Sequence, residues 1–160
     1  MSQRVPMTQR GYEALKAELQ RLKSVDRPAN VKEIETAIAH GDLSENAEYH
    51  AAKEKQGHIA ARIAQLDDKI ARAQVIETNG QTPDKVRFGA TVVLRDAETD
   101  DEVRYTIVGE DEADAKQGRI SITSPVAQAL MNKTVGDEVS VKVPKGRREL
   151  EVVRISFGDA

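Results

Sequence analysis

Residues 52–73 read AKEKQGHIAARIAQLDDKIARA. Spacings of three and four alternate along a series with a single polar member, which consists of Ala52, Gln56, Ile59, Ile63, Leu66, Ile70 and Ala73. The positions between them hold mainly Glu, Lys, Arg, Gln and Ala, which favour helix. This pattern is typical of the seam of a coiled coil. An earlier seam of the same kind consists of Tyr12, Leu15, Leu19, Leu22, Val31, Ile34 and Ile38. The two seams predict two amphipathic helices that pack against each other.

The two seams can be paired as an antiparallel hairpin. Facing residues of such a hairpin have position numbers with a nearly constant sum, and Leu22 with Ile63 gives 85. Half of this sum places the turn near residue 43. There Gly41 is a natural helix stop, and Asp42 with Glu45 three residues later has the pattern of a helix start. Seam and turn chemistry therefore predict the same turn.

We expect residues 8–40 and 44–76 to form the two arms of this hairpin. At 1.5 Å per residue, each arm would be roughly 45–50 Å long. Pro28 falls in the gap of the first seam. It should kink the first arm or interrupt it briefly, and it should push Arg27 out of the helical region.

The hydrophobic period changes near residue 78. Residues 79–84, NGQTPD, read as a turn-forming linker. Short runs of β-forming residues follow and predict strands at Val86–Phe88, Thr91–Leu94, Val103–Val108, Ile120–Thr123, Val139–Val143 and Leu150–Phe157, with Val153 out of phase in the last. Between them, Ser124 as N-cap and Pro125 at the first helical position predict one short helix.

The fold class is therefore α+β. Residues 1–78 are expected to form a long antiparallel helical hairpin, a coiled coil with an acidic tip near residues 41–46. Residues 79–160 are expected to form a small antiparallel β domain with one helix. The acidic run from Asp96 to Asp114 reads as solvated loop and edge-strand protection.

Composition limits the possible functions. The 160 residues carry a net charge of −3, with no Cys, no Trp, two Phe and three Tyr. A disulfide scaffold, thiolate chemistry and Cys-ligated metals are excluded. So few aromatics argue against an aromatic-lined pocket or a base-stacking platform. No run of about eighteen apolar residues and no signal-peptide core is present, so we expect a cytoplasmic protein without a membrane segment.

The tip is the most distinctive charged segment. Between His40 and His50 lie three acids, Asp42, Glu45 and Glu48, and no Lys or Arg. Asp42 and Glu45 could be a capping box only, or they could offer two carboxylates to a hard divalent cation. Mg²⁺ prefers about six oxygens, so further ligands would have to come from a partner. A zinc site is disfavoured, because the histidines lack the i, i+4 spacing that would place them on one helix face.

Two other features leave alternatives open. Lys53 and Lys55 are either a solvated helix face or a weak contact for nucleic-acid phosphates. Ser124 and Pro125 are first of all a helix start, but an exposed helix start next to a strand can also be a docking edge.

Residues 41–52, GDLSENAEYHAA, resemble the tip signature of the Gre-type bacterial transcript cleavage factors, especially the GreA branch. Weaker likenesses follow in the order of that family at residues 88–92, 107–114 and 120–125. The resemblance covers nearly the whole chain. It implies that the C-terminal domain has an FKBP-like fold.

The resemblance also implies a function without intrinsic enzyme activity. A member docks through its β domain, here by Thr123, Ser124 and Pro125, on the rim of the secondary channel of bacterial RNA polymerase. Its hairpin runs down the channel, and Asp42 and Glu45 would help to hold the second catalytic Mg²⁺ at the active centre. The polymerase then hydrolyses its own backtracked RNA near the 3′ end. We expect a monomer with no cofactor of its own, and Mg²⁺ held jointly with the polymerase.

The chain departs from this family at one position. Ile38 stands where a basic residue is common, which leaves Lys53 and Lys55 as the candidates for contact with RNA. Three other functions remain to be distinguished. They are a cleavage-inactive regulator that occupies the same channel, a prolyl isomerase whose pocket would have to use the few aromatics of the β half, and a purely structural coiled coil.

Overall fold

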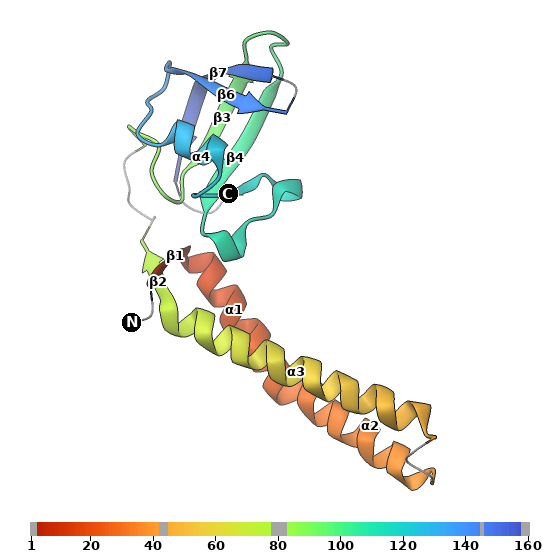
Figure 1. Ribbon diagram of the computed structural model, residues 1–160. Coiled ribbons are helices and arrows are strands. Elements are labelled where there is room, and N and C mark those ends of the chain that lie inside the picture. The colour runs from red at the N-terminus through yellow and green to blue at the C-terminus, as the bar shows by residue number, and fades with distance from the viewer. Residues whose placement is uncertain (1–2, 42–44, 78–82, 145, 158–160) are drawn as a thin grey trace. The chain divides into compact units, whose positions relative to one another are not determined.

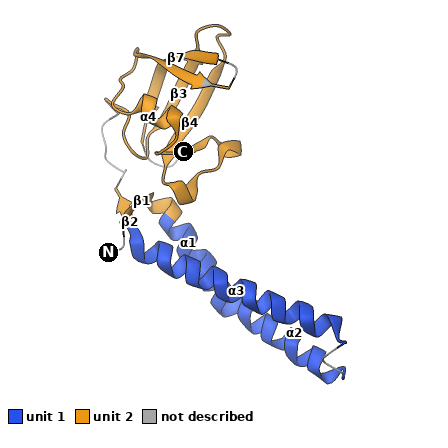
Figure 2. Ribbon diagram, in the orientation of Figure 1, with its two compact units in different colours: residues 1–3, 12–73 blue, residues 4–11, 74–160 orange. Residues whose placement is uncertain are grey.

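The computed structural model describes residues 3–41, 45–77, 83–144 and 146–157. The chain divides into two compact units (Figure 2). The first comprises residues 1–3 and 12–73, and the second comprises residues 4–11 and 74–160. The predicted boundary at residue 78 lies outside the described residues. The eight residues that precede Tyr12 group with the β-rich unit, and not with the hairpin as the division at residue 78 implies.

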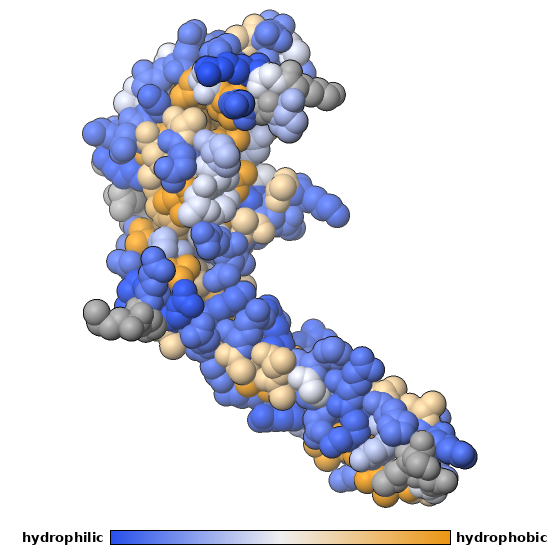
Figure 3. All heavy atoms as spheres, in the orientation of Figure 1, coloured by the Kyte–Doolittle hydropathy of each residue, from blue (hydrophilic) through white to orange (hydrophobic). Residues whose placement is uncertain are grey.

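The first unit is an antiparallel helical hairpin (Figure 1). Its first arm consists of α1 (Gln9–Arg21), a π-helical turn (Leu22–Asp26) and α2 (Arg27–Ala39), and its second arm is α3 (Ala47–Arg72). The residues buried between the arms are Leu15, Leu22, Asn30, Ala37, Ala52, Ile59, Ile63 and Leu66. The hairpin predicted from the two seams is confirmed. Its surface is mostly hydrophilic, with a few apolar patches (Figure 3).

The π-helical turn accommodates Pro28 without breaking the first arm. Proline lacks an N–H, and its ring collides with the carbonyl four residues earlier in an α-helix. The N–H of Arg27 donates to the carbonyl of Leu22, five residues back, which widens the turn before the proline. Arg27 keeps helical angles, with φ −64° and ψ −47°. The predicted brief interruption is therefore a π turn, whereas the expectation that Arg27 leaves the helical region is wrong.

The π turn also changes which residues of α2 face α3. Because it inserts one extra residue, the buried face moves by one position, and Asn30 and Ala37 lie between the arms. Val31 and Ile38, predicted to continue the seam, are 44% and 50% exposed. The prediction was wrong for these two residues, because it resumed the seam at the apolar side chains after Pro28, whereas the π turn places Asn30 and Ala37 on the buried face. Ile34 remains half-buried.

The second arm ends earlier than predicted. α3 stops at Arg72, and Ala73–Ile76 form strand β2, which pairs with β1 (Val5–Thr8) in a two-stranded sheet. Ala73 has the extended angles φ −64° and ψ 132°. The predicted helix over residues 73–76 and at Thr8 was wrong, because the two segments supply each other with backbone partners.

The second unit contains a five-stranded sheet in the order β5-β4-β3-β7-β6. The strands are β3 (Thr91–Asp96), β4 (Glu102–Val108), β5 (Arg119–Ser121), β6 (Glu138–Val143) and β7 (Gly146–Ser156). All pairs are antiparallel except β4 with β5. The register between β3 and β7 shifts by one residue at Val153, the position expected to be out of phase. The α+β class is confirmed.

Helix α4 (Pro125–Leu130) packs against this sheet and completes its core. The fully buried side chains include Val92, Leu94, Ile107, Leu130 and Val152. Between β4 and β5 the chain forms two short 3₁₀ turns, Glu110–Glu112 and Ala115–Gln117. No helix within the described ranges is both long and apolar enough to cross a lipid bilayer.

The predicted strand at Val86–Phe88 does not form. The Val86 N–H donates to the carbonyl of Lys133 at 2.8 Å, and the Val86 carbonyl accepts from the N–H of Asn132 at 2.8 Å. The Ala90 N–H donates to the carbonyl of Arg87 and closes a turn. A β-forming composition was not sufficient here, because the residues after α4, and not a neighbouring strand, satisfy the backbone.

A buried carboxylate joins β1 to the rest of the second unit. The side chain of Glu112 is only 3% exposed. Its oxygens accept from the N–H of Thr8 at 2.9 Å, the N–H of Gly109 at 3.0 Å and the Arg119 guanidinium at 3.2 Å, and also from the Thr8 hydroxyl. Asp96 is likewise buried and binds Arg148. The acidic run is therefore not solvated at these two positions, where the predicted solvent exposure was wrong.

Candidate functional site at the tip of the hairpin

The first arm ends at the expected glycine. The N–H of His40 donates to the carbonyl of Ala37 at 3.1 Å, and that of Gly41 donates to Ile38 at 3.2 Å. Gly41 has φ +115°, a conformation that residues with a Cβ rarely adopt. The helix stop predicted at Gly41 is confirmed.

The second arm begins with Asn46 as its N-cap. The Asn46 Oδ1 accepts from the N–H of Tyr49 at 3.0 Å, which satisfies one free donor at the start of α3. Its Nδ2 donates to the carbonyl of Ala37 at 2.7 Å, in the last turn of α2. One side chain thus bonds to both arms at the point where they meet. The structure therefore corrects the expected helix start at Asp42 and Glu45.

Asn46 was inside the quoted tip signature, but the sequence reasoning gave it no role. Asn is among the preferred N-cap residues, and Ala47 begins a run of good helix formers. That signal could have located the cap. The bond to Ala37 could not have been found in this way, because it depends on how the two arms are paired.

The described part of the tip is acidic and exposed. Glu45 and Glu48 are both exposed, and Glu48 Oε2 lies 3.3 Å from Nδ1 of His40. Asp42, the other predicted acid, lies outside the described residues. Within the described ranges no group of three or more His, Asp or Glu side chains could hold a metal ion. Any Mg²⁺ bound by Glu45 would therefore need ligands from beyond this part of the chain.

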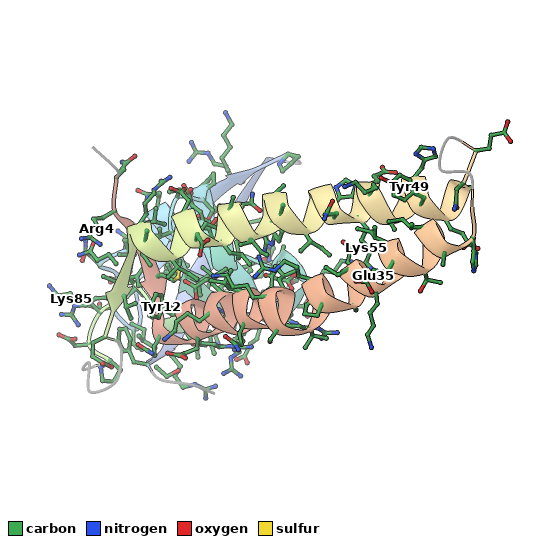
Figure 4. The ribbon with its side chains drawn as sticks, turned by 90° about the horizontal axis from the view of Figure 1, so that it is seen from below. Arg4, Tyr12, Glu35, Tyr49, Lys55 and Lys85 are labelled. Carbon is green, nitrogen blue, oxygen red and sulfur yellow. The ribbon has the colours of Figure 1, made fainter. Side chains whose placement is uncertain are left out.

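The two lysines of the second arm have different surroundings. Lys55 Nζ lies 3.0 Å from Oε1 of Glu33, so its side chain points toward the first arm (Figure 4). Lys53 Nζ donates to Oε1 of Gln56 at 2.8 Å, and no carboxylate of the described residues forms an ion pair with it. Because a carboxylate already balances Lys55, Lys53 is the better of the two for contact with an anion.

A further ion pair joins the arms nearer their base. The Arg62 guanidinium contacts both carboxylate oxygens of Glu18, at 2.6 and 2.8 Å. The hydrogen bonds from Arg62 lower the pKa of Glu18 below its usual value. Two-point contact of this kind restricts sliding of one arm along the other.

The predicted docking residues lie in the second unit, between the edge strand β5 and helix α4. Ser124 is the N-cap of α4, and its Oγ accepts from the N–H of Ala127 at 3.2 Å. Thr123 and Pro125 are exposed. The short helix predicted from Ser124 and Pro125 is confirmed, while a docking role for this segment stays a prediction. Of the aromatics that an isomerase pocket would need, Tyr105 and Phe157 pack against the hydrophobic core.

Comparison with known proteins identifies the chain's relatives. The N-terminal domain of the transcription elongation factors GreA and GreB matches residues 5–75, and their C-terminal domain matches residues 81–157. Transcription elongation factor GreA of Hyphomonas neptunium is 57% identical over 155 residues, which are 97% of this chain and 99% of that protein. Transcription elongation factor GreA of Anaeromyxobacter sp. is 60% identical over 155 residues, 97% of this chain and 93% of that protein.

Among solved structures, GreA factor homolog 1 of Thermus thermophilus is similar over 96% of this chain and 99% of its own. The sequence identity is 30% and the TM-score is 0.44. The helical hairpin from α1 to α3 lies within the first matched range, and the five-stranded sheet lies within the second. The chain belongs to the GreA/GreB family.

Proposed function

We propose that this chain enters the secondary channel of bacterial RNA polymerase and stimulates the polymerase's own cleavage of backtracked RNA. The observation that carries the proposal is the tip of the hairpin. The side chain of Asn46 bonds to both helices there, so the exposed carboxylate of Glu45 belongs to the neighbour of a residue that joins the two arms. The family match along both units supports the same function.

Asp42 and Glu45 are the residues that would act in the reaction. Their carboxylate oxygens would complete the coordination of a Mg²⁺ ion held jointly with the polymerase. Such an ion stabilises charge on the attacking and leaving oxygens of a phosphodiester. The chain would supply no complete metal site of its own and would not be an enzyme by itself. Asn46 would keep Glu45 at a fixed place relative to both arms.

The other candidates would act in binding. Lys53 would contact phosphates near the RNA 3′ end, and Lys55 would contribute less because Glu33 pairs with it. Thr123, Ser124 and Pro125 would contact the rim of the channel. Their position beside an edge strand supports this role, because exposed strand edges and helix starts offer unpaired backbone groups to a partner.

The test uses purified polymerase halted in a backtracked state on a template, with RNA labelled at its 5′ end or near its 3′ end. Adding the chain with Mg²⁺ should release short fragments from the RNA 3′ end. Asp42→Asn and Glu45→Gln should abolish the release and keep the affinity for polymerase. Glu35→Gln is the matched control, since Glu35 is an exposed acid of the same hairpin away from its tip.

The outcomes separate the alternatives. Full cleavage with either tip variant would refute the role of these acids. Binding by the parent chain without fragments would identify a cleavage-inactive regulator of the channel. Absence of both binding and cleavage would leave only a structural role for the coiled coil.

A further inference from the structure

A groove runs between α2 and α3 inside the first unit. Its volume is about 570 Å³, and it is lined from one side by Arg27 and Val31 and from the other by Lys53, Gly57 and Ala60. It lies along the middle of α3, away from the tip acids. None of the roles proposed above uses it as a groove.

The groove results from two features of the sequence. The π turn moves Val31 out of the buried seam, so that this valine is 44% exposed and lines the groove. Gly57 lies in the interior of the 26-residue helix α3, and a Cβ placed there would have no atom within 4 Å. Glycine is the poorest helix former after proline. No close approach within the described chain requires it at this position, yet its missing side chain deepens the groove.

The charge of the groove is one-sided. Arg27 and Lys53 line it, and no described acidic residue does. Two cations elsewhere on the hairpin are paired with carboxylates, Arg62 with Glu18 and Lys55 with Glu33. The floor is apolar, since Ile59 and Ile63 contribute to it. The groove therefore combines an apolar floor with positive charge.

We propose that this groove receives a segment of RNA polymerase that carries an apolar side chain beside one or more carboxylates. The inference rests on the proposed function, because that function requires a complex with polymerase and the groove would be one of the contacts in it. A carboxylate would complement Arg27, the cation of the groove that has no other proposed role, and the apolar side chain would cover the floor beside Val31. A nucleic-acid backbone fits less well, because it would leave the apolar floor uncovered.

The decisive variant is Gly57→Leu in the full chain. Leucine fills the groove and favours helix, so the variant should fold with a Tm at least equal to that of the parent. Its Kd for core polymerase without nucleic acid, measured by fluorescence anisotropy, should rise about tenfold or more. Ala64→Leu is the matched control, because Ala64 is exposed on the same helix and does not line the groove. It should bind as the parent does.

A second pair of variants tests the charge. Arg27→Glu should weaken binding to core polymerase, and Arg27→Lys should largely retain it, because a carboxylate partner responds to the sign of the charge. Equal affinities for these two variants would exclude an acidic occupant and overturn the proposal.

The remaining outcomes are equally decisive. If Gly57→Leu binds core polymerase as tightly as the parent, the groove is not occupied in the complex. If its binding is weakened only when backtracked RNA is present, the occupant is nucleic acid and the proposal is wrong. A parent chain that does not bind polymerase at all would refute both this inference and the proposed function. A parent that binds and cleaves, with unchanged affinity in Gly57→Leu, would refute the groove alone.

Discussion

Replacing Asn46 by alanine should loosen the tip of the hairpin without affecting either core. The substitution removes the cap on the Tyr49 N–H and the bond to the Ala37 carbonyl. Loss of an N-cap costs about 1 kcal/mol. Loss of a partly buried hydrogen bond costs about 1 kcal/mol more. Together these losses should lower the free energy of local opening at the tip by about 2 kcal/mol.

Native-state hydrogen exchange measures this opening. The amide of His50 is the best reporter, because it donates to the backbone carbonyl of Asn46 at 3.1 Å, a bond that the substitution leaves in place. Its exchange should accelerate by about 30-fold in Asn46→Ala, since 1.4 kcal/mol corresponds to about a factor of ten. Asn46→Ser is the matched control. It keeps a capping oxygen and loses only the donor to Ala37, so exchange should accelerate about fivefold.

Cleavage of backtracked RNA should decline in the same order, from parent to Asn46→Ser to Asn46→Ala, while affinity for polymerase is retained. Equal exchange of the His50 amide in all three proteins would refute the reasoning, because it would mean that Asn46 does not join the arms. Faster exchange with undiminished cleavage would show that the joint is structural and does not position Glu45.

Three further predictions concern the cores and pH. Leu66 is fully buried between the arms, so Leu66→Ala should lower the free energy of unfolding by about 2–5 kcal/mol. An unchanged Tm would contradict the place of Leu66 in the seam. Glu112→Gln should speed amide exchange at Thr8, whose N–H it binds; unaltered exchange would argue against this anchor. The hydrogen bond from the Glu98 N–H, and after it the one from the Arg148 guanidinium, lowers the pKa of Asp96 below its usual range. The carboxylate therefore stabilises the fold fully above about pH 4, and this gain is lost as the pH falls through the lower folded pKa. The difference in free energy of unfolding between the parent and Asp96→Asn should shrink on acidification. A difference that stays constant with pH would disprove the stabilising role of the ionised carboxylate.

Much of the hairpin could be predicted from the spacing of its apolar residues. Leu15, Leu22, Ile63 and Leu66 were placed in the seam and are buried. The prediction fails after the π turn, where one additional residue rotates the helix face. Apolar spacing alone does not reveal such a turn, because its position depends on how Pro28 is accommodated in the folded arm.

The candidate site could be predicted only in part. Its acidic character and the glycine stop follow from the order of residues 41–48. The joint made by Asn46 does not, because its second bond goes to Ala37, nine residues earlier on the facing arm. From the sequence, Lys55 was either part of a solvated helix face or a phosphate contact. Its pairing with Glu33, 22 positions away, appears only when the arms are aligned.

The sequence by itself determined the features that depend on near neighbours. The period of apolar residues set helix in one half and strand in the other, Gly41 ended the first arm, and Ser124 with Pro125 started α4. Tertiary structure alone decided which of these residues meet. It turned residues 73–76 into a strand by pairing them with β1, and it buried the carboxylate of Glu112 against Thr8, 104 positions away. The physical reason is that buried backbone and charged groups need partners, and these partners can come from any part of the folded chain. The residues near such a group in the sequence therefore do not predict which partner it will have.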